Sequence, residues 1–339
     1  MALLEVNDLK TYFKTRAGDA RAVDGVSFSI DPGVNFGLLG ESGCGKTTAA
    51  KSIIRLLPPN GRIAGGSIMF KGRDLATASK EQIRKTRWQE ISMISQSAMN
   101  ALDPVYKVGE QIVEAIRAHR DVSKTEAMNR ARELFDLVGV DHRRLEAYPH
   151  QFSGGMRQRA IIAMSLALNP SLIIADEPTT ALDVIVQDQI LRRIASLQKK
   201  MNASILMITH DISVVAEICS RAAVMYAGKI AEIGSITGIL KRPFHPYSMG
   251  LKNAFPSILG EKQELISIPG APPQLVDPPA GCLFHPRCPF SLDICTEKIP
   301  PLMQVGDDQF AACHRVSEAE KLRGLAADRK TWERMETAA

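Results

Sequence analysis

The stretch that decides the fold is Gly40-Glu41-Ser42-Gly43-Cys44-Gly45-Lys46-Thr47, which matches the pattern G-x-x-x-x-G-K-[ST]. An apolar run precedes it at 34–39, and apolar residues recur at helical spacing over 47–57. A strand, a glycine-rich loop and a helix in this order predict an α/β fold. Backbone N–H groups and the helix N-terminus converge on phosphate oxygens in that context, so the loop predicts a phosphate site.

The side chains of this loop have separate predicted roles. Lys46 would neutralise the β- and γ-phosphates of a nucleotide, and the Thr47 hydroxyl would ligate Mg²⁺. The alternative is a glycine-rich turn that contains Lys-Thr by chance, and the strand-to-helix context argues against it. The other predicted contacts to nucleotide from this segment are Gly40, Ser42, Gly43, Cys44, Gly45 and Thr48.

Two further apolar runs end in polar residues that suit phosphate chemistry. The run 172–175 is followed by Asp176 and Glu177, and the run 205–208 is followed by Thr209 and His210. Ligands bind at the carboxyl ends of parallel strands, so we expect Asp176 to hold Mg²⁺ through water and Glu177 to polarise the attacking water. His210 would sense the γ-phosphate. An Asp-Glu pair alone is commonly a solvated loop and a lone His is usually structural, so these roles depend on the phosphate loop.

The composition is that of an ordinary globular protein. The 339 residues predict about two domains at roughly 150 residues each, with 45% hydrophobic and 23% charged residues. Lys plus Arg minus Asp plus Glu is 42 − 37 = +5, which selects no class of partner. No run approaches the roughly 18 apolar residues of a membrane span, and the first ten residues lack the pattern of a signal peptide. We therefore expect a protein that stays in the cytosol.

Periodicity and composition divide the chain into regions with different predicted structure. Partial alternation over 2–30 predicts an antiparallel strand pair, and helical spacing predicts helices at 108–120 and 124–138. A helical stretch at 184–200 between the strands 172–175 and 204–208 predicts a parallel βαβ unit, and a last strand pair is expected at 223–226 and 229–233. Prolines become frequent beyond Gly234, and 316–339 predicts a charged, solvated helix. The predicted domains are 1–234, with a helical subdomain at about 95–169, and 235–339.

One segment points to a known family. Phe152-Ser153-Gly154-Gly155-Met156, followed by Arg157-Gln158-Arg159, resembles the signature segment of ABC transporter ATP-binding subunits. Its first and fifth residues depart from the usual Leu and Gln. The resemblance covers about 3–234 and implies a P-loop NTPase core of ABC type with an antiparallel β subdomain and a helical insertion. It also implies that Ser153, Gly154 and Gly155 bind the γ-phosphate of ATP held by the opposite subunit, so hydrolysis needs a dimer.

The same resemblance implies roles for three other residues. Gln96 resembles the glutamine that links Mg²⁺ and the attacking water to the helical subdomain, although Ser97-Ala98 replace the acidic residue and proline that often follow it. Asp183 belongs to the segment Ala181-Leu182-Asp183, which resembles the loop that crosses the dimer interface in that family. Phe13 resembles the aromatic residue that stacks on adenine. Tyr12 is its near rival, and a core role for either one remains open.

Four cysteines crowd the C-terminal part. The runs 243–247 and 281–289 resemble the C-terminal extension of the oligopeptide/dipeptide importer branch. Four thiols are the number that one 4Fe-4S cluster or one Zn²⁺ requires, and the resemblance implies the cluster. Zinc, with His314 or His285 as a further candidate ligand, is the second interpretation, and four reduced buried thiols without a metal are the third. The four predicted ligands are Cys282, Cys288, Cys295 and Cys313.

The resemblance implies an ATPase that drives import of oligopeptides or dipeptides. Its expected partners are two transmembrane permeases, a second ATPase subunit that is a copy or a related chain, and indirectly an extracytoplasmic solute-binding protein, with no nucleic acid among them. The expected location is peripheral, on the cytoplasmic face of the membrane. Nickel or sugar importers handle other solutes on the same scheme. A soluble ABC-type ATPase acting on nucleic acid or ribosomes is disfavoured by the single phosphate loop and the lack of heptads. A redox sensor built on the cysteines is the remaining rival.

Overall fold

The computed structural model describes residues 1–95, 101–179, 184–254 and 266–336. They divide into two compact units. The first unit comprises residue 1, 31–35 and 77–208, and the second comprises 2–30, 36–76 and 209–339. None of the described helices is both long and apolar enough to span a bilayer.

The first unit joins a short parallel sheet to a group of helices. Strand β7 pairs in parallel with β6 on one side and with β8 on the other, and every residue of β7 is buried. Burial along the whole strand explains why its sequence is a continuous apolar run rather than an alternation. The strands are β6 (Ile91–Ile94), β7 (Leu172–Asp176) and β8 (Ser204–Thr209).

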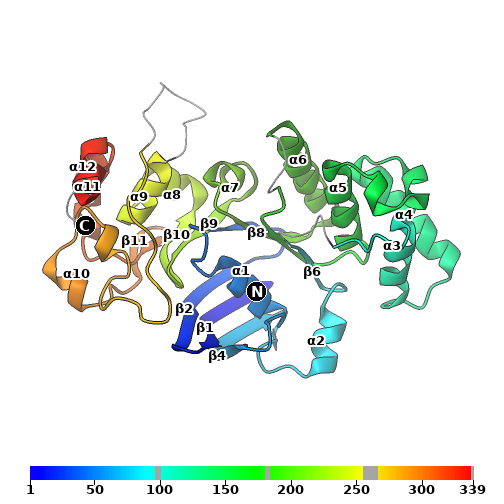
Figure 1. Cartoon of the computed structure of the whole chain (residues 1–339), viewed down its shortest axis with the longest axis horizontal. Helices are drawn as coiled ribbons and strands as arrows, with labels where there is room; N and C mark the ends of the chain where they lie inside the picture. The colour runs from blue at the N-terminus through cyan, green and yellow to red at the C-terminus, as the bar shows by residue number, and fades with distance from the viewer. Residues whose placement is uncertain (96–100, 180–183, 255–265, 337–339) are drawn as a thin grey trace. The chain divides into compact units, whose positions relative to one another are not determined.

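The helices of the first unit begin where the sequence offers capping residues. Ser79 and Ser123 each form a capping box with the third helical residue, and Gly139 ends the second of these helices with a left-handed φ of 71°. Helices α3, α4 and α5 pack on one another (Figure 1). The helices are α2 (Lys80–Thr86), α3 (Val108–Arg117), α4 (Lys124–Val138), α5 (Gly154–Ser165) and α6 (Val184–Met201), with 3₁₀ turns at His142–Glu146 and Pro149–Gln151.

The second unit contains an antiparallel sheet in the order β2-β1-β4-β5. Leu4 pairs with Ile30 and Thr15 with Gly18, which confirms the strand pair predicted over 2–30. A second set of strands in this unit includes β3, which leads into the phosphate loop. Strand β3 pairs in parallel with β9. Antiparallel pairs then join β9 to β10, β10 to β12 and β12 to β11. The strands are β1 (Leu4–Thr15), β2 (Gly18–Ile30), β3 (Asn35–Leu39), β4 (Gly61–Phe70), β5 (Arg73–Asp74), β9 (Arg221–Tyr226), β10 (Lys229–Ser235), β11 (Met303–Gly306) and β12 (Gln309–Ala311).

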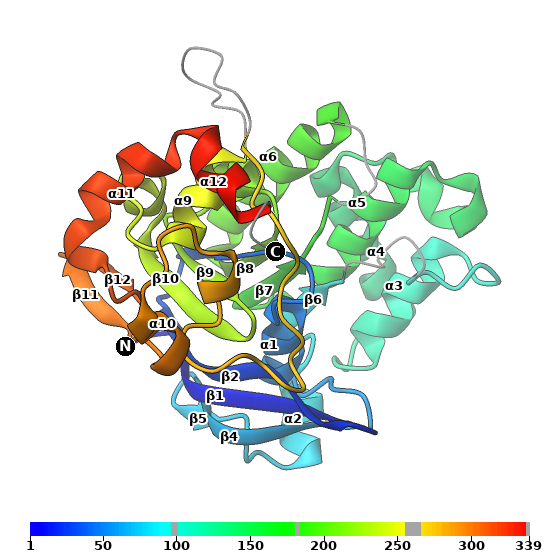
Figure 2. The same cartoon turned by 60° about the vertical axis from the view of Figure 1, so that its left-hand side comes forward.

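The helices of the second unit differ from the prediction at two places. The helix after the phosphate loop ends at Ile53 rather than near 57, because Arg55 has a left-handed φ of 50° and prolines follow at 58 and 59. The expected solvated helix over 316–339 is wrong. The chain forms α11 and α12 there (Figure 2). The side chain of Trp332 in α12 is only 1% exposed. The helices are α1 (Lys46–Ile53), α7 (Ile212–Ile218), α8 (Ile236–Lys241), α9 (Pro246–Asn253), α10 (Asp293–Glu297), α11 (Ala319–Ala326) and α12 (Arg329–Glu336), with 3₁₀ turns at His285–Arg287 and Val316–Glu318.

Candidate functional site

The phosphate loop connects β3 to α1, as the sequence predicts. Its glycines at 40, 43 and 45 have φ angles of 148°, 78° and 105°, a region that residues with a Cβ rarely adopt. A Cβ on Gly40 would lie 2.2 Å from the carbonyl oxygen of Met225, and one on Gly45 would lie 2.1 Å from that of Ala22. The backbone therefore passes so close to β9 and β2 that only glycine fits at these two positions.

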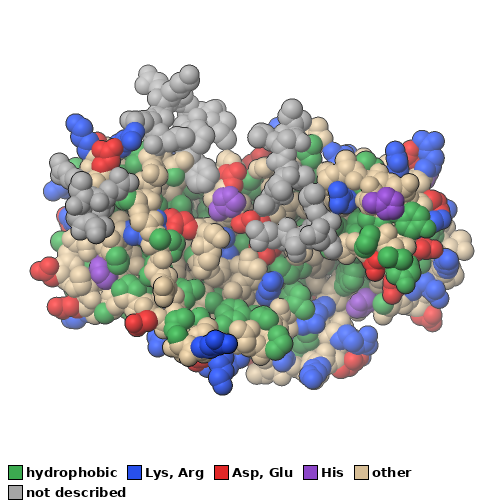
Figure 3. All heavy atoms as spheres, viewed as in Figure 1, with side chains coloured by type: hydrophobic (Ala, Val, Ile, Leu, Met, Phe, Trp, Pro, Cys, Tyr) green, Lys and Arg blue, Asp and Glu red, His purple; other side chains and the backbone are tan. Residues whose placement is uncertain are grey.

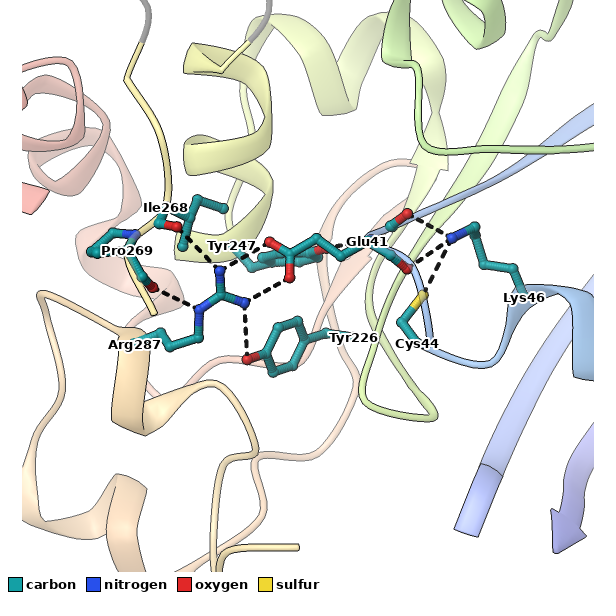
Figure 4. A network of polar contacts seen from close by, with 9 residues as sticks. Glu41, Cys44, Lys46, Tyr226, Tyr247, Ile268, Pro269 and Arg287 are labelled. Atoms are coloured by element: carbon teal, nitrogen blue, oxygen red, sulfur yellow. Dashed lines mark hydrogen bonds and ion pairs between the residues drawn. The ribbon is translucent and has the colours of Figure 1, made fainter. Parts of the chain in front are cut away.

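Lys46 is the first residue of α1, directly after the loop, and its exposed fraction is 5%. Its Nζ donates hydrogen bonds to the carbonyl oxygens of Gly40 (2.6 Å) and Glu41 (2.8 Å) and contacts Cys44 Sγ at 3.8 Å (Figure 4). Burial raises the pKa of the Cys44 thiol, so this contact is made to a neutral group. Gly45 supplies no side chain to cap the start of α1, and the N-terminus of a helix attracts anions.

The two aromatic candidates for the adenine contact lie on β1 and are both half-buried. The hydroxyl of Tyr12 donates a 2.7 Å hydrogen bond to Asp24, which ties this residue to the neighbouring strand β2. The ring of Phe13 covers Gly61 of β4, where a Cβ would lie 2.7 Å from Phe13 Cε1. The ring of Phe13 is wholly apolar, whereas the hydroxyl of Tyr12 is bound to Asp24. An apolar ring face is the surface on which a base stacks.

The predicted carboxylates follow β7 in the first unit. Asp176 ends the strand and is 1% exposed, and Glu177 has a left-handed φ of 47°. The turn is fixed by two hydrogen bonds: Glu177 N–H donates to the Ile208 carbonyl at 2.8 Å, and Gln158 Nε2 donates to the Pro178 carbonyl at 2.5 Å. A strained non-glycine residue at a strand end, held from both sides, is typical of a functional position.

His210 belongs to the second unit, where it directly follows β8 and is exposed. Its neighbour Asp211 caps α7 by accepting a hydrogen bond from Ser213 N–H at 2.8 Å. The structure thus brings together the phosphate-loop residues in the second unit and Asp176 with Glu177 in the first.

The signature segment begins α5. Ser153 is the N-cap, and its hydroxyl accepts a hydrogen bond from Met156 N–H at 3.3 Å. Gly154 and Gly155 form the first turn, and a Cβ on Gly155 would lie 2.9 Å from Val186. Ser153 is exposed and the two glycines are half-buried, so this end of α5 faces outward.

The unusual first residue of that segment has a structural role. Phe152 is 4% exposed and packs edge-on against Phe135 of α4, with ring centroids 6.5 Å apart. Phenylalanine at this position therefore belongs to the apolar core between α4 and α5. Gln96 and Asp183, with their neighbours Ser97, Ala98, Ala181 and Leu182, lie outside the described residues.

The four C-terminal cysteines line one small cavity of about 10 Å³, together with His245, His285 and His314. They lie in described ranges, and none forms a disulfide. Burial raises the pKa of the thiols of Cys282, Cys288 and Cys313, that of Cys313 to about 11. Among the described residues, however, no three His, Cys, Asp or Glu side chains gather closely enough to hold a metal ion. The predicted metal centre therefore has its donor set in one cavity but not its ligand geometry.

The residues that surround Glu41 were not predicted from the sequence. Tyr247 Oη accepts a hydrogen bond from the Glu41 N–H at 2.9 Å, and Arg287 forms an ion pair with the Glu41 carboxylate at 2.7 Å. Arg287 stands in the cysteine-rich run, 246 residues from Glu41. No periodicity or spacing joins residues so far apart, and an arginine beside cysteines carries no signal for a phosphate loop.

The exposed surface adds one observation. On the face drawn in Figure 3, acidic and basic side chains are interspersed over the described residues. A nucleic-acid-binding face is instead expected to gather Lys and Arg in a stripe or patch. This face therefore does not favour a nucleic-acid partner.

Comparisons with known proteins bear on the whole chain. The family model described as "ABC transporter" matches residues 23–180, and "Oligopeptide/dipeptide transporter, C-terminal region" matches 231–295. A "Probable peptide ABC transporter ATP-binding protein y4tR" of Sinorhizobium fredii is 48% identical over 94% of this chain and 97% of its own length. The "Oligopeptide transport ATP-binding protein OppD" of Escherichia coli is 45% identical over 94% of each chain.

A solved structure resembles part of the chain. It is the "Dimeric structure of a post-hydrolysis state of the ATP-binding cassette MJ0796 bound to ADP and Pi". The TM-score is 0.62 at 25% sequence identity, and the match covers 69% of this chain and 98% of that one.

Proposed function

Because the chain belongs to the family of ABC transporter ATP-binding proteins of the oligopeptide and dipeptide type, we propose that it is the ATP-hydrolysing subunit of a peptide importer. The observation that carries this proposal is the phosphate loop, in which two glycines that admit no Cβ bring backbone N–H groups and Lys46 to one place. A loop of this kind, followed directly by a helix, is built for the phosphates of a nucleotide.

The residues divide the work of hydrolysis as follows. Lys46 and the start of α1 bind the phosphates, Thr47 and Asp176 hold Mg²⁺, and Glu177 accepts a proton from the attacking water. Mg²⁺ supplies charge neutralisation at the phosphates when it is bound. The buried position of Asp176 at the end of β7 and the strained backbone of Glu177 support these roles. The other proposed contacts are Phe13 with adenine, and His210 and Gln96 near the γ-phosphate.

A second protomer completes the site in this proposal. Ser153, Gly154 and Gly155 would bind the γ-phosphate held by the partner subunit, and Asp183 would lie beside that interface. The outward-facing N-terminus of α5, with its serine cap and two glycines, supports this role, because the N-terminus of a helix attracts anions. A solved cassette with the same fold is described as dimeric.

The remaining partners are two permeases in the membrane and, indirectly, an extracytoplasmic solute-binding protein. We place the chain on the cytoplasmic face of the membrane, as a peripheral subunit.

The loop before α3 is the proposed contact with the permeases: it exposes Val105 and Tyr106, whose exposed fractions are 72% and 57%. Exposed apolar side chains side by side are suited to an interface. The proposed ATP-binding domain is 1–234, with the helical subdomain at about 95–169, and the proposed C-terminal extension is 235–339.

The test is reconstitution of the chain with the permeases, the second ATPase and the binding protein encoded beside it, in lipid vesicles. We expect Mg-ATP hydrolysis that rises when the binding protein carries a di- or oligopeptide, together with peptide uptake. Stimulation by nickel or a sugar and not by peptides would replace the substrate but keep the importer. Failure of the complete complex to hydrolyse ATP would refute the function.

We also propose that Cys282, Cys288, Cys295 and Cys313 hold one metal centre, a 4Fe-4S cluster first and zinc second. The support is chemical: four thiols that line one cavity make a complete ligand set for either. Iron, sulfide and zinc assays, with the visible absorption of anaerobically purified protein, distinguish the two. If protein purified without oxygen contains neither iron nor zinc, the four cysteines are reduced thiols that hold no metal.

A further inference from the structure

Glu41 is held at three groups, its N–H, its carbonyl and its carboxylate, although the phosphate-loop pattern allows any residue at its position. Its carbonyl oxygen accepts a hydrogen bond from Lys46 Nζ, and its N–H donates to Tyr247 Oη. Its carboxylate forms the ion pair with Arg287, with distances of 2.7 Å to Nη1 and 3.1 Å to Nη2 (Figure 4). The backbone that receives the phosphate-binding lysine is thus tied to α9 and to the C-terminal extension through one residue.

Arg287 is unusually well anchored for an arginine. It is 6% exposed, and all five of its N–H donors have an acceptor. Besides the two bonds to Glu41, Nε donates to the Pro269 carbonyl at 2.8 Å, Nη2 to the Ile268 carbonyl at 3.2 Å and Nη1 to Tyr226 Oη at 3.3 Å. The guanidinium therefore joins three segments at one point: the phosphate loop, the end of β9 and the chain at 268–269.

These contacts suit arginine and no other residue. The fork of the guanidinium matches a carboxylate with two parallel bonds while its remaining donors reach the carbonyls, whereas a lysine has one ammonium and cannot span the same set. Removing the arginine would leave the Glu41 carboxylate without its ionic partner at a part-buried position, where it is 25% exposed. The Glu41 carboxylate would then turn toward water, and the backbone of Glu41, whose carbonyl Lys46 uses, would lose its ionic tie to the extension.

We propose that Arg287 is a positioning residue for the nucleotide: it fixes Glu41, and through Glu41 the loop and Lys46, so that ATP affinity depends on the C-terminal extension. The inference rests on the proposed function, because it takes the loop to be the ATP site. Coupling between two sites is reciprocal, so bound ATP should stabilise the extension by the same factor by which Arg287 strengthens ATP binding.

The first experiment measures the affinity of the full-length chain for a fluorescent ATP analogue, trinitrophenyl-ATP. Couplings between sites are typically about 5- to 150-fold, and we expect Arg287→Met to weaken binding about tenfold, with Arg287→Lys falling between it and the parent. Glu41→Gln, which keeps the shape and removes the charge, should weaken binding as well. If Arg287→Met does not fold, Arg287→Lys and Glu41→Gln decide the matter.

Combining Arg287→Met with Glu41→Gln tests whether Arg287 acts through Glu41. Residues that act as a unit give non-additive effects, so the double variant should bind no more weakly than the worse single one. The matched control is Arg323→Met. Arg323 also lies in the C-terminal extension, where it donates to the Pro243 carbonyl and stacks on Phe244, and both of these partners belong to the extension itself. Its loss should leave affinity within about twofold of the parent, well below the tenfold coupling expected for Arg287.

The second experiment tests the reverse direction by hydrogen exchange of peptides from 266–290. Mg-ATP should slow their exchange in the parent and in Arg323→Met but not in Arg287→Met. Unchanged affinity in all Arg287 and Glu41 variants, fully additive losses in the double variant, or equal protection in Arg287→Met would each overturn the inference. A parent chain that fails to bind the analogue at all would instead overturn the proposed function.

Discussion

Replacing Gly45 by alanine should damage the phosphate loop far more than the same change at Gly43. Both glycines lie in the loop and both have left-handed φ angles, 105° and 78°. They differ in their surroundings. A Cβ on Gly45 would lie 2.1 Å from the backbone oxygen of Ala22, whereas one on Gly43 would meet nothing within 4 Å.

The size of each effect follows from these two facts. An L-residue in the left-handed region costs roughly 1–2 kcal/mol, and this is the whole of the expected loss at Gly43. Gly45→Ala adds an overlap with a backbone atom that cannot turn aside, and overpacking of a closed site costs about 1–3 kcal/mol more. We therefore expect Gly45→Ala to lower the free energy of unfolding by about 2–5 kcal/mol.

Thermal unfolding of the nucleotide-free chain, followed by near-ultraviolet circular dichroism, measures the difference. One kcal/mol moves the midpoint by about 2–4 °C in a domain of 150–250 residues, so the two variants should be clearly separated. Gly72→Ala is a control outside the loop, because Gly72 has a φ of 76° and its Cβ would also meet nothing within 4 Å. It should resemble Gly43→Ala. Equal midpoints for Gly43→Ala and Gly45→Ala would refute the steric argument.

Other predictions concern single side chains. Glu177→Gln should retain ATP binding but lower phosphate release by about 10²- to 10⁴-fold, because it removes the general base, and turnover equal to that of the parent would contradict the assignment. Lys46→Ala should weaken binding of trinitrophenyl-ATP by about tenfold to a hundredfold, since a charge-assisted hydrogen bond contributes about 1.5–3 kcal/mol; unchanged binding would remove Lys46 from the phosphate site. Burial raises the pKa of Cys219 to about 12, so iodoacetamide should label it at pH 7.5 only after unfolding, and its thiolate should become abundant only as the pH approaches 12. Mass spectrometry of native and urea-treated protein checks this, and native labelling as fast as that in urea would show that the thiol is not protected.

The local parts of the fold and site could be predicted because their signals are local. The glycines of the phosphate loop, the buried run of β7 and the serine caps of α4 and α5 are each contained in a few neighbouring residues. Periodicity also gave α3 and α4 within a few residues of their bounds. The early end of α1 was harder to foresee, because the left-handed backbone at Arg55 leaves no mark on apolar spacing.

The parts that could not be predicted depend on contacts between distant residues. Trp332 belongs to a segment rich in charge, yet its indole lies against Gly250 of α9, and Asn253 of the same helix donates to the Ala326 carbonyl. Arg287 and Glu41 were each visible inside a motif, yet nothing in either motif requires the other. Pairing of this kind is decided by the path of the chain through space, which a single sequence does not state.

Residues 309–311 protect the outer edge of strand β10. Glu232 and Ile233 pair there with Ala311 and Phe310 of β12, so a chain that stopped at Gly234 would present a row of unsatisfied backbone groups on its last strand. Bare strand edges recruit strands from other molecules. A cassette shortened to Gly234 would therefore be more prone to aggregate, so the extension contributes to the folding quality of the ATP-binding domain by covering its last strand.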